Sequence, residues 1–271
     1  MSSTAAPAED MTPLPARHAA PIFTFSRAFN TAGWLILAVL VYFLVIPAAR
    51  YGNWSPFAAG STWEFLWKGL QVTLFVAVFS VVISTIVGFF LALGRLSNNK
   101  LIARLSAGYI ELMRALPSYL IIFYVFIVFP KIGVQLPAPW FAISGLSLYT
   151  SAVMAEIFRA GILSVEKGQL EAAYALGLRP FHTVMYIILP QALRRMVPSI
   201  VSQLITLVKD TSLASIIALQ ELTAAGRQLY EYYGQTQGKP IVLETLFVVA
   251  VIYFVVCYIL ALISHRLEIK A

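Results

Sequence analysis

The residues best placed to do chemistry in this chain form a polar segment, 169–190, that lies between two apolar runs. In it, Leu170, Ala173, Tyr174 and Gly177 recur at positions i, i+3, i+4 and i+7, which is the spacing of one helical face. Small side chains on that face would allow another backbone to approach closely. The segment therefore predicts a short helix that docks in a groove of another protein, with a loop helix packed on its own protein as the alternative.

The end of this predicted helix is also indicated by residue type. Gly177 can adopt the left-handed conformation that ends a helix, and Pro180 is expected to prevent the helix from resuming. A helix this short is marginal in water on its own. We therefore expect it to need a docked partner.

Other reactive side chains give no sign of an enzyme. The three histidines, His18, His182 and His265, are scattered and have no metal-ligand spacing. No P-loop pattern G-x-x-x-x-G-K-[ST] occurs, so the chain is not expected to bind or hydrolyse ATP itself. Cys257 is the single cysteine and cannot form an intrachain disulfide. We therefore predict no catalytic residue, no metal site and no cofactor on this chain.

The composition predicts a protein that crosses a membrane several times. Hydrophobic residues make up 60% of the 271 residues and charged residues 11%, against about 25% charged in soluble domains. The net charge of +7 does not indicate nucleic acid, because the basic residues gather in particular loops rather than in a stripe with interleaved aromatics. The expected fold class is all-α, embedded in a lipid bilayer.

Six apolar stretches approach the roughly 20 residues that a membrane-spanning helix requires. They are 32–49, 69–94, 115–130, 140–155 (continuing as a helix through Glu156 and Arg159), 196–219 (interrupted by Lys209 and Asp210) and 245–264. The segment 220–243 is too polar to span and is expected to lie partly on the membrane surface.

Lysine and arginine counts predict the orientation of these spans. With the N-terminus inside, twelve basic residues fall in cytoplasmic segments: Arg17, Arg27, Arg95, Lys100, Arg104, Arg114, Lys167, Arg179, Arg194, Arg195, Arg266 and Lys270. Five fall outside: Arg50, Lys68, Lys131, Arg227 and Lys239. This excess places both termini and the 169–190 segment in the cytoplasm.

Two charged groups inside the spans require a reason, because a charge at mid-membrane costs about 2.5–3.5 kcal/mol on insertion scales. Glu156 and Arg159 lie three residues apart and share a helix face, so we expect an ion pair that pins this helix to its neighbours or to the cytoplasmic helix of the 169–190 segment, with substrate contact as the alternative.

The second group is the run of Lys209, Asp210, Thr211 and Ser212. A broken helix in a transporter often marks the pathway or a gate, and the alternative is a passive helix end at the outer interface. If Lys209 faces the pathway, it can attract a substrate carboxylate.

The 169–190 segment resembles the cytoplasmic signature of permease subunits of ATP-binding-cassette importers, E-A-A, three residues, G, nine residues, I-x-L-P. The fixed positions are all present, as Glu171, Ala172, Ala173, Gly177, Ile187, Leu189 and Pro190. The surrounding sequence is similar to the polar amino-acid group of that family. The similar segments are 111–117 (ELMRALP), 151–162 (SAVMAEIFRAGI), 189–194 (LPQALR) and 209–213 (KDTSL).

This resemblance implies a type I importer fold and a transport function. Glu171, Ala172, Ala173, Tyr174, Gly177 and Leu178 would belong to the coupling helix that docks on the ATPase subunit. Residues 67–264 would form the permease domain, preceded by a disordered tail (1–30) and an extra helix (31–50) and followed by a short tail (265–271). Many members of the group have five spans, so the first predicted span is a departure.

The implied partners are two ATPase subunits, which would hold the ATP and magnesium, a second permease in a homodimer or heterodimer, and an extracytoplasmic amino-acid-binding protein. The implied location is the bacterial inner membrane, and the implied cargo is a polar amino acid such as glutamate, aspartate or glutamine. The alternatives are a permease for another small polar solute, an ion-coupled carrier or channel, and a membrane-integral enzyme.

Overall fold

The computed structural model describes residues 52–238 and 240–268, together with residues 39, 42 and 46. The chain divides into two units, 1–46 and 47–271, and the second contains the site. The predicted tail (1–30) and most of the predicted first span (32–49) lie outside the described residues. Of that span, Val39, Tyr42 and Ile46 are helical and exposed.

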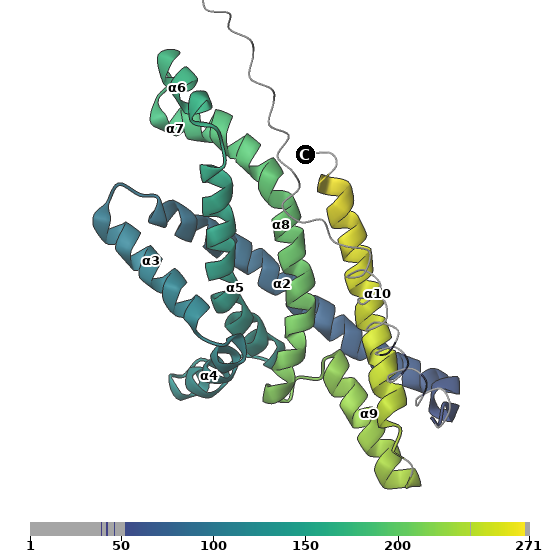
Figure 1. The fold of residues 1–271 in the computed structure, drawn as a ribbon. Helices are drawn as coiled ribbons and strands as arrows, with labels where there is room; N and C mark the ends of the chain where they lie inside the picture. The colour runs from purple at the N-terminus through teal and green to yellow at the C-terminus, as the bar shows by residue number, and fades with distance from the viewer. Residues whose placement is uncertain (1–38, 40–41, 43–45, 47–51, 239, 269–271) are drawn as a thin grey trace, which may run out of the picture. The chain divides into compact units, whose positions relative to one another are not determined.

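The described part of residues 47–271 consists of helices and connecting turns, without a strand (Figure 1). The elements in chain order are the 3-10 helix η1 (Ser55–Ala58), α2 (Gly60–Arg95), α3 (Lys100–Ala115), α4 (Ser118–Lys131), α5 (Ala138–Leu163), α6 (Lys167–Ala175), α7 (Pro180–Thr183), the π-helix η2 (Val184–Ile188), α8 (Leu189–Asp210), the 3-10 helix η3 (Thr211–Ile217), α9 (Leu222–Gln237) and α10 (Val242–Glu268).

Within these residues, four helical runs are long and apolar enough to cross a membrane: α2, α5, the run Pro180–Ile217 and α10. Apolar helices contain the predicted stretches 69–94, 140–155 and 245–264, which confirms those three predictions. The all-helical membrane fold is therefore the one that the composition predicts.

The predicted third span, 115–130, largely coincides with the 14-residue helix α4, which a bend joins to α3. The apolar helix α4 begins only at Ser118, and the pair of α3 and α4 is bent by 104°. The bend occurs because a residue before proline is disfavoured in the α region. Leu116, which precedes Pro117, accordingly has φ −91° and ψ 140°. If the bent pair counts as one span, the described residues contain five spans.

The helix that contains the predicted fifth span, 196–219, begins earlier in the structure than the sequence predicts. The helical run starts at Pro180, and the part before Met196 carries exposed polar residues, including Arg194 and Arg195, that a search for apolar length omits. The expected interruption at Lys209 and Asp210 is also displaced. The α-helix continues through both residues and changes to a 3-10 helix at Thr211.

Most of the segment 220–243 forms the helix α9, which is not among the helices long and apolar enough to span a membrane. Leu222, Ala225 and Leu229 are buried, because α9 packs against α2 and α10. Its cap is unusual, since Glu221 accepts hydrogen bonds from the backbone N–H groups of the first turn.

The long helices α2 and α5 pack closely through small residues. Gly88 of α2 faces Met154 so closely that a Cβ there would lie 2.6 Å from the Met154 Cβ and 2.9 Å from the Ser151 carbonyl oxygen. The Ser84 hydroxyl donates to the Ser147 carbonyl at 3.4 Å. Small side chains of this kind are the usual means by which membrane helices approach each other. We call this contact the α2–α5 seam.

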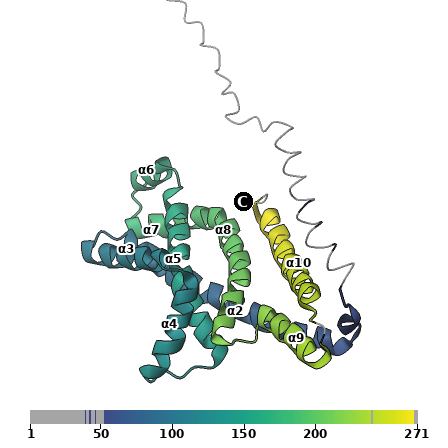
Figure 2. The same cartoon turned by 60° about the horizontal axis from the view of Figure 1, so that its bottom comes forward.

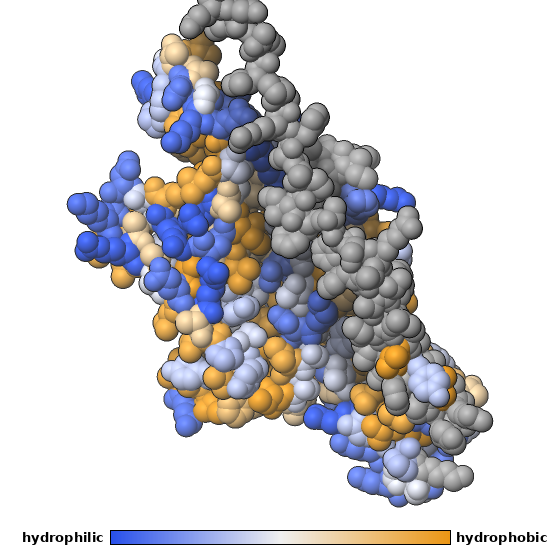
Figure 3. All heavy atoms as spheres, viewed as in Figure 1, coloured by the Kyte–Doolittle hydropathy of each residue, from blue (hydrophilic) through white to orange (hydrophobic). Residues whose placement is uncertain are grey.

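The two ends of this helical unit differ in what they contain. The helices α6 and α7, the N-terminal end of α8 and the C-terminal end of α10 gather at one end, whereas α4, η3 and α9 lie toward the other (Figures 1 and 2). On the visible face, hydrophobic residues are mixed with weakly polar ones over α4, whereas the N-terminal end of α3 is strongly hydrophilic (Figure 3). The polar 169–190 segment is thus carried beyond the apolar body of the helices.

Candidate functional site

The helix α6 ends in the way its sequence predicts. Gly177 has φ +72°, the left-handed conformation, and its N–H donates to the Tyr174 carbonyl at 2.9 Å. The N–H of Leu178 reaches back to the Ala173 carbonyl at 3.1 Å. These two bonds form a Schellman motif, which satisfies carbonyls that a helix end otherwise leaves without partners. The turn that follows α6 is therefore fixed by backbone hydrogen bonds alone.

Pro180 acts differently from the prediction. It does not stop the chain from becoming helical again but is the first residue of α7. Proline suits this position, because its fixed φ matches the helix and its missing N–H is not needed there.

The segment then rejoins the long helix through a π turn. The N–H of Leu189 donates to the Val184 carbonyl, five residues back. The turn immediately precedes Pro190, which has no N–H and whose ring crowds the carbonyl four residues earlier, so the wider turn accommodates the proline. Pro190, the last position of the signature, therefore accounts for the π turn that precedes it.

The predicted coupling residues divide into buried and exposed groups. Ala173 is buried where α6 meets α7 and the π turn, so it packs within this segment and is not free to contact a partner. Glu171, Ala172 and Gly177 are exposed, and Leu170 and Leu178 are partly buried. Tyr174 is about half exposed. The predicted face is therefore only partly a docking face.

Next to the predicted docking face in the sequence, further apolar side chains are exposed that the sequence analysis did not single out. Leu176 is 80% exposed, Phe181 67% and Tyr186 73%. His182 stacks on Tyr186 with ring centroids 5.9 Å apart. The aromatic residues within an otherwise polar segment were the available signal. We call Tyr174, Leu176, Phe181, Met185 and Tyr186 the apolar loop surface.

Glu156 and Arg159 form an ion pair, with the Arg159 Nη2 donating to Glu156 Oε2 at 2.9 Å. Arg95, at the end of α2, donates to the other oxygen of Glu156 and lies 3.8 Å from Glu111 of α3. The pair thus connects α5 to α2 and α3. Among the described residues, no hydrogen bond joins it to α6.

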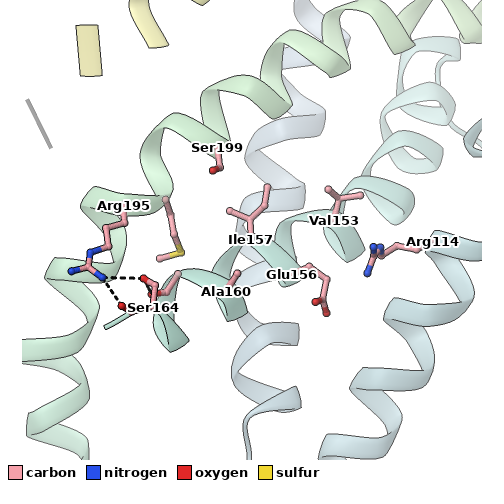
Figure 4. Close-up of a pocket in the computed structure, with 10 residues that line it drawn as sticks. Arg114, Val153, Glu156, Ile157, Ala160, Ser164, Arg195 and Ser199 are labelled. Carbon is pink, nitrogen blue, oxygen red and sulfur yellow. Dashed lines mark hydrogen bonds between the residues drawn. The ribbon is translucent and has the colours of Figure 1, made fainter. Parts of the chain in front are cut away.

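A cavity of about 510 Å³ opens beside this network, between α3, α5 and α8 (Figure 4). Arg195 and Ser164 lie on one side of it, and Arg114 and Glu156 on the other. The Arg195 guanidinium donates to the backbone carbonyl of Ser164 and lies 3.4 Å from its hydroxyl oxygen. The cavity therefore has basic groups from two helices.

Only part of the run from Lys209 to Ser212 lines a second, smaller cavity. Lys209 and Ser212 line a cavity of about 290 Å³, together with Thr223 and Tyr253. Thr211 is buried, and its hydroxyl donates to the Val208 carbonyl at 2.8 Å. Asp210 is not among the lining residues. The geometry thus leaves Lys209 and Ser212 as the members of this run that can meet a solute.

Glu221 is a buried carboxyl behind this cavity that the sequence analysis missed. It accepts from the backbone N–H groups of Thr223 at 2.8 Å and Ala224 at 2.7 Å, and from the Tyr253 hydroxyl at 3.0 Å. Burial raises the pKa of the Glu221 carboxyl, and these donors partly offset the rise. An acidic residue directly before a helical pattern was the available signal.

Comparisons with known proteins agree with this arrangement. Residues 84–269 match the family model for the binding-protein-dependent transport system inner membrane component. The chain is 42% identical to the probable glutamine ABC transporter permease protein GlnP of Bacillus subtilis over 206 residues, which covers 76% of this chain and 93% of that protein. It is 35% identical to the glutamate transport system permease protein GluD of Corynebacterium glutamicum, covering 80% and 78%.

Solved structures show the same fold. A crystal structure of an amino acid ABC transporter with histidines contains a chain that is 28% identical, with a TM-score of 0.69 over 77% of this chain and 94% of that one. A chain of the MetNI methionine ABC transporter in an inward-facing conformation is 19% identical, with a TM-score of 0.65.

Proposed function

This chain belongs to the family of binding-protein-dependent transport system inner membrane components, and from that premise we propose that it passes a polar amino acid through the membrane in an importer driven by separate ATPase subunits. The observation that carries the proposal is the projecting segment formed by α6, α7 and the π turn. It presents the apolar loop surface outside the apolar body of the helices, where a partner can bind it. Exposed apolar side chains concentrated in one short segment, here between Tyr174 and Tyr186, indicate a protein interaction site.

The segment is built to transmit movement as well as to bind. The Schellman turn fixes α6 relative to α7, and the π turn continues without a break into α8. A displacement of α6 by the ATPase is therefore passed to a helix that crosses the membrane. For transport to follow, the segment must have different contact energies with the two states of the ATPase dimer.

The partners that this mechanism requires are those of the family. The sequence has no phosphate-binding loop, so in the proposed complex ATP and magnesium are held by the ATPase subunits. A second permease, identical or related, completes the path, and an extracytoplasmic binding protein delivers the amino acid. The proposed location is the bacterial inner membrane, with α6 and both termini in the cytoplasm, which agrees with the lysine and arginine count.

Glutamine is the first cargo to test, with glutamate second, because the similar permeases carry these names. Within the membrane, Lys209 offers a positive charge to the cargo's α-carboxylate at the smaller cavity. Since every α-amino acid has that group, this contact would not select the side chain. A related small polar solute is the alternative cargo.

The test is uptake by the reconstituted complex of permease, ATPase and binding protein in proteoliposomes. We expect ATP-dependent uptake of labelled glutamine, with competition by a panel of amino acids identifying the cargo. Glu171→Lys, which reverses an exposed charge on α6, is expected to lower uptake while the protein still inserts. Uptake that proceeds without the ATPase would instead identify an ion-coupled carrier, and normal coupled uptake by the variant would exclude α6 from coupling.

A further inference from the structure

The cavity between α3, α5 and α8 is lined by arginine and serine side chains that the proposed coupling mechanism does not use. We propose that it binds the α-carboxylate of the transported amino acid on the side of the membrane where α6 lies, as the last binding site before release. This inference rests on the proposed function, because it takes its ligand from the transported cargo. The cavity is separate from the one lined by Lys209.

The charges around the cavity favour an anion. Arg114 and Arg195 line it from two different helices, whereas Glu156 is its one acidic lining residue. The two oxygens of Glu156 already accept from Arg95 and Arg159. Glu156 offsets only part of the positive charge of Arg95, Arg114, Arg159 and Arg195, so this side of the cavity remains net positive and attracts a carboxylate.

The donors needed to hold a carboxylate are available. A guanidinium has five N–H donors, and the bonds of Arg195 to Ser164 use its Nη1. Ser199 follows Arg195 by one helical turn, so its hydroxyl lies on the same face of α8. Arg114 lines the cavity beside Glu156, and the charges of these two side chains interact. Arginine and carboxylate form bidentate, charge-assisted bonds, so Arg195 is the natural anchor.

The rest of the cavity suits the remainder of a small amino acid. Its walls include apolar side chains from α5 and α8, namely Val153, Ile157, Ala160 and Met196. Its volume of about 510 Å³ lies within the roughly 300–1,000 Å³ of small-molecule sites. The arginine anchor at one side meets the α-carboxylate, and the apolar walls meet the methylene groups of the amino-acid side chain.

The position of the cavity explains when it would be occupied. It lies at the α6-proximal part of α5 and α8, since Ser164 follows the last residue of α5 and Arg195 lies in the second turn of α8. Cargo that leaves on this side encounters these groups last. Because cargo must be released from this cavity, the site is expected to bind the amino acid weakly. Free amino acid at high concentration on the same side enters the same cavity, so binding can be measured without the binding protein.

The experiment measures direct binding of labelled L-glutamine to the permease–ATPase complex in nanodiscs without the binding protein, with L-glutamate used instead if uptake selects it. Removing one charged hydrogen bond of about 1.5–3 kcal/mol weakens binding about tenfold or more. We expect this loss in Arg195→Gln. Glutaminamide, which lacks the α-carboxylate, is expected not to compete.

Two further variants separate the cavity from a general effect on folding. Arg194→Gln removes the neighbouring exposed arginine, which does not line the cavity, and is expected to bind as the wild type does. Ser199→Leu obstructs the cavity without touching the bond between Arg195 and Ser164, and is expected to lower binding. Binding by these two variants is compared with that of the wild type in complexes that have equal ATPase activity.

Several results would overturn the inference while leaving the proposed function intact. One is active uptake with no binding in the absence of the binding protein. Another is equal binding by Arg194→Gln and Arg195→Gln, and a third is loss of binding only in Lys209→Gln. Competition by anionic lipid in the nanodisc, without competition by free amino acid, would assign the cavity to a lipid headgroup and would also reject it. Failure of uptake itself would instead reject the proposed function.

Discussion

The projecting segment that contains α6 and the α2–α5 seam use small residues for opposite purposes. In the seam, Gly88 allows two membrane helices to come so close that an added Cβ would meet the backbone of α5. In the segment, nothing lies within 4 Å of a Cβ added at Gly177, and the glycine serves a positive φ. One glycine therefore acts through packing and the other through backbone conformation.

The side chains of the two regions differ in the same way. The seam buries Ser80, Ser84 and Ser147, whereas the segment exposes Leu176 and Phe181. A buried contact stabilises the permease itself. In the segment, local backbone hydrogen bonds fix the chain, and its exposed apolar side chains contribute little to the fold. These side chains are available to another protein. The comparison predicts that stability and coupling can be impaired separately.

The largest effect is expected from Gly88→Ala. The new Cβ meets the Ser151 carbonyl and the Ala155 nitrogen, neither of which can move away easily, so we expect a destabilisation of up to about 3 kcal/mol, as for an overpacked core. Thermal unfolding of the purified chain in detergent measures it. Gly108→Ala is the control, since nothing lies within 4 Å there and a helical alanine gains about 0.5–1 kcal/mol over glycine. Equal melting temperatures for the two variants would mean that the seam is loosely packed.

The next effect is expected on partner binding. Phe181→Ala removes an exposed ring from the apolar loop surface, and central aromatic anchors contribute about 2 kcal/mol or more to an interface. We expect about 30-fold weaker association with the ATPase subunit, measured by titration in nanodiscs, with unfolding changed by less than about 0.5 kcal/mol. Phe254→Ala, which removes a similarly exposed ring from α10, is the control for loss of an exposed aromatic side chain. Unchanged ATPase affinity in Phe181→Ala would place the interface elsewhere.

The sequence predicted these two regions unequally. Apolar length located α2, α5 and α10, because a membrane-spanning helix must satisfy its backbone internally and expose apolar side chains. The end of α6 followed from Gly177, whose conformation is a local property. The bend at Pro117 is a local effect of the proline that a search for apolar length does not register. The partners of Glu156 were harder to predict, because they depend on where α2 and α3 lie relative to α5.

The cavities were not predictable from the sequence for the same reason. Arg114 belongs to the 111–117 segment and Arg195 lies 81 residues further along the chain, and nothing in the sequence indicates that the fold places them around one cavity. The buried Glu221 likewise acquires its partner Tyr253 only when α9 packs on α10. Residues that act through their own backbone could be predicted, whereas residues that act through a distant neighbour required the structure.

The smallest effect in free energy is expected from Gly177→Ala, but it sharpens the comparison most. The left-handed conformation costs an L-residue about 1–2 kcal/mol, so the Schellman turn loosens locally. Because the residue is exposed and touches no membrane helix, we expect the melting temperature of the helical body to remain near that of the wild type. The amount of amino acid transported per ATP hydrolysed is expected to fall, since α6 is then held less firmly to α7 and α8. Gly168→Ala is the matched control, because Gly168 lies in the same segment without a positive φ and with nothing within 4 Å. If the two variants transport equally well per ATP, the fixed turn is not what conveys movement from the ATPase to the membrane helices.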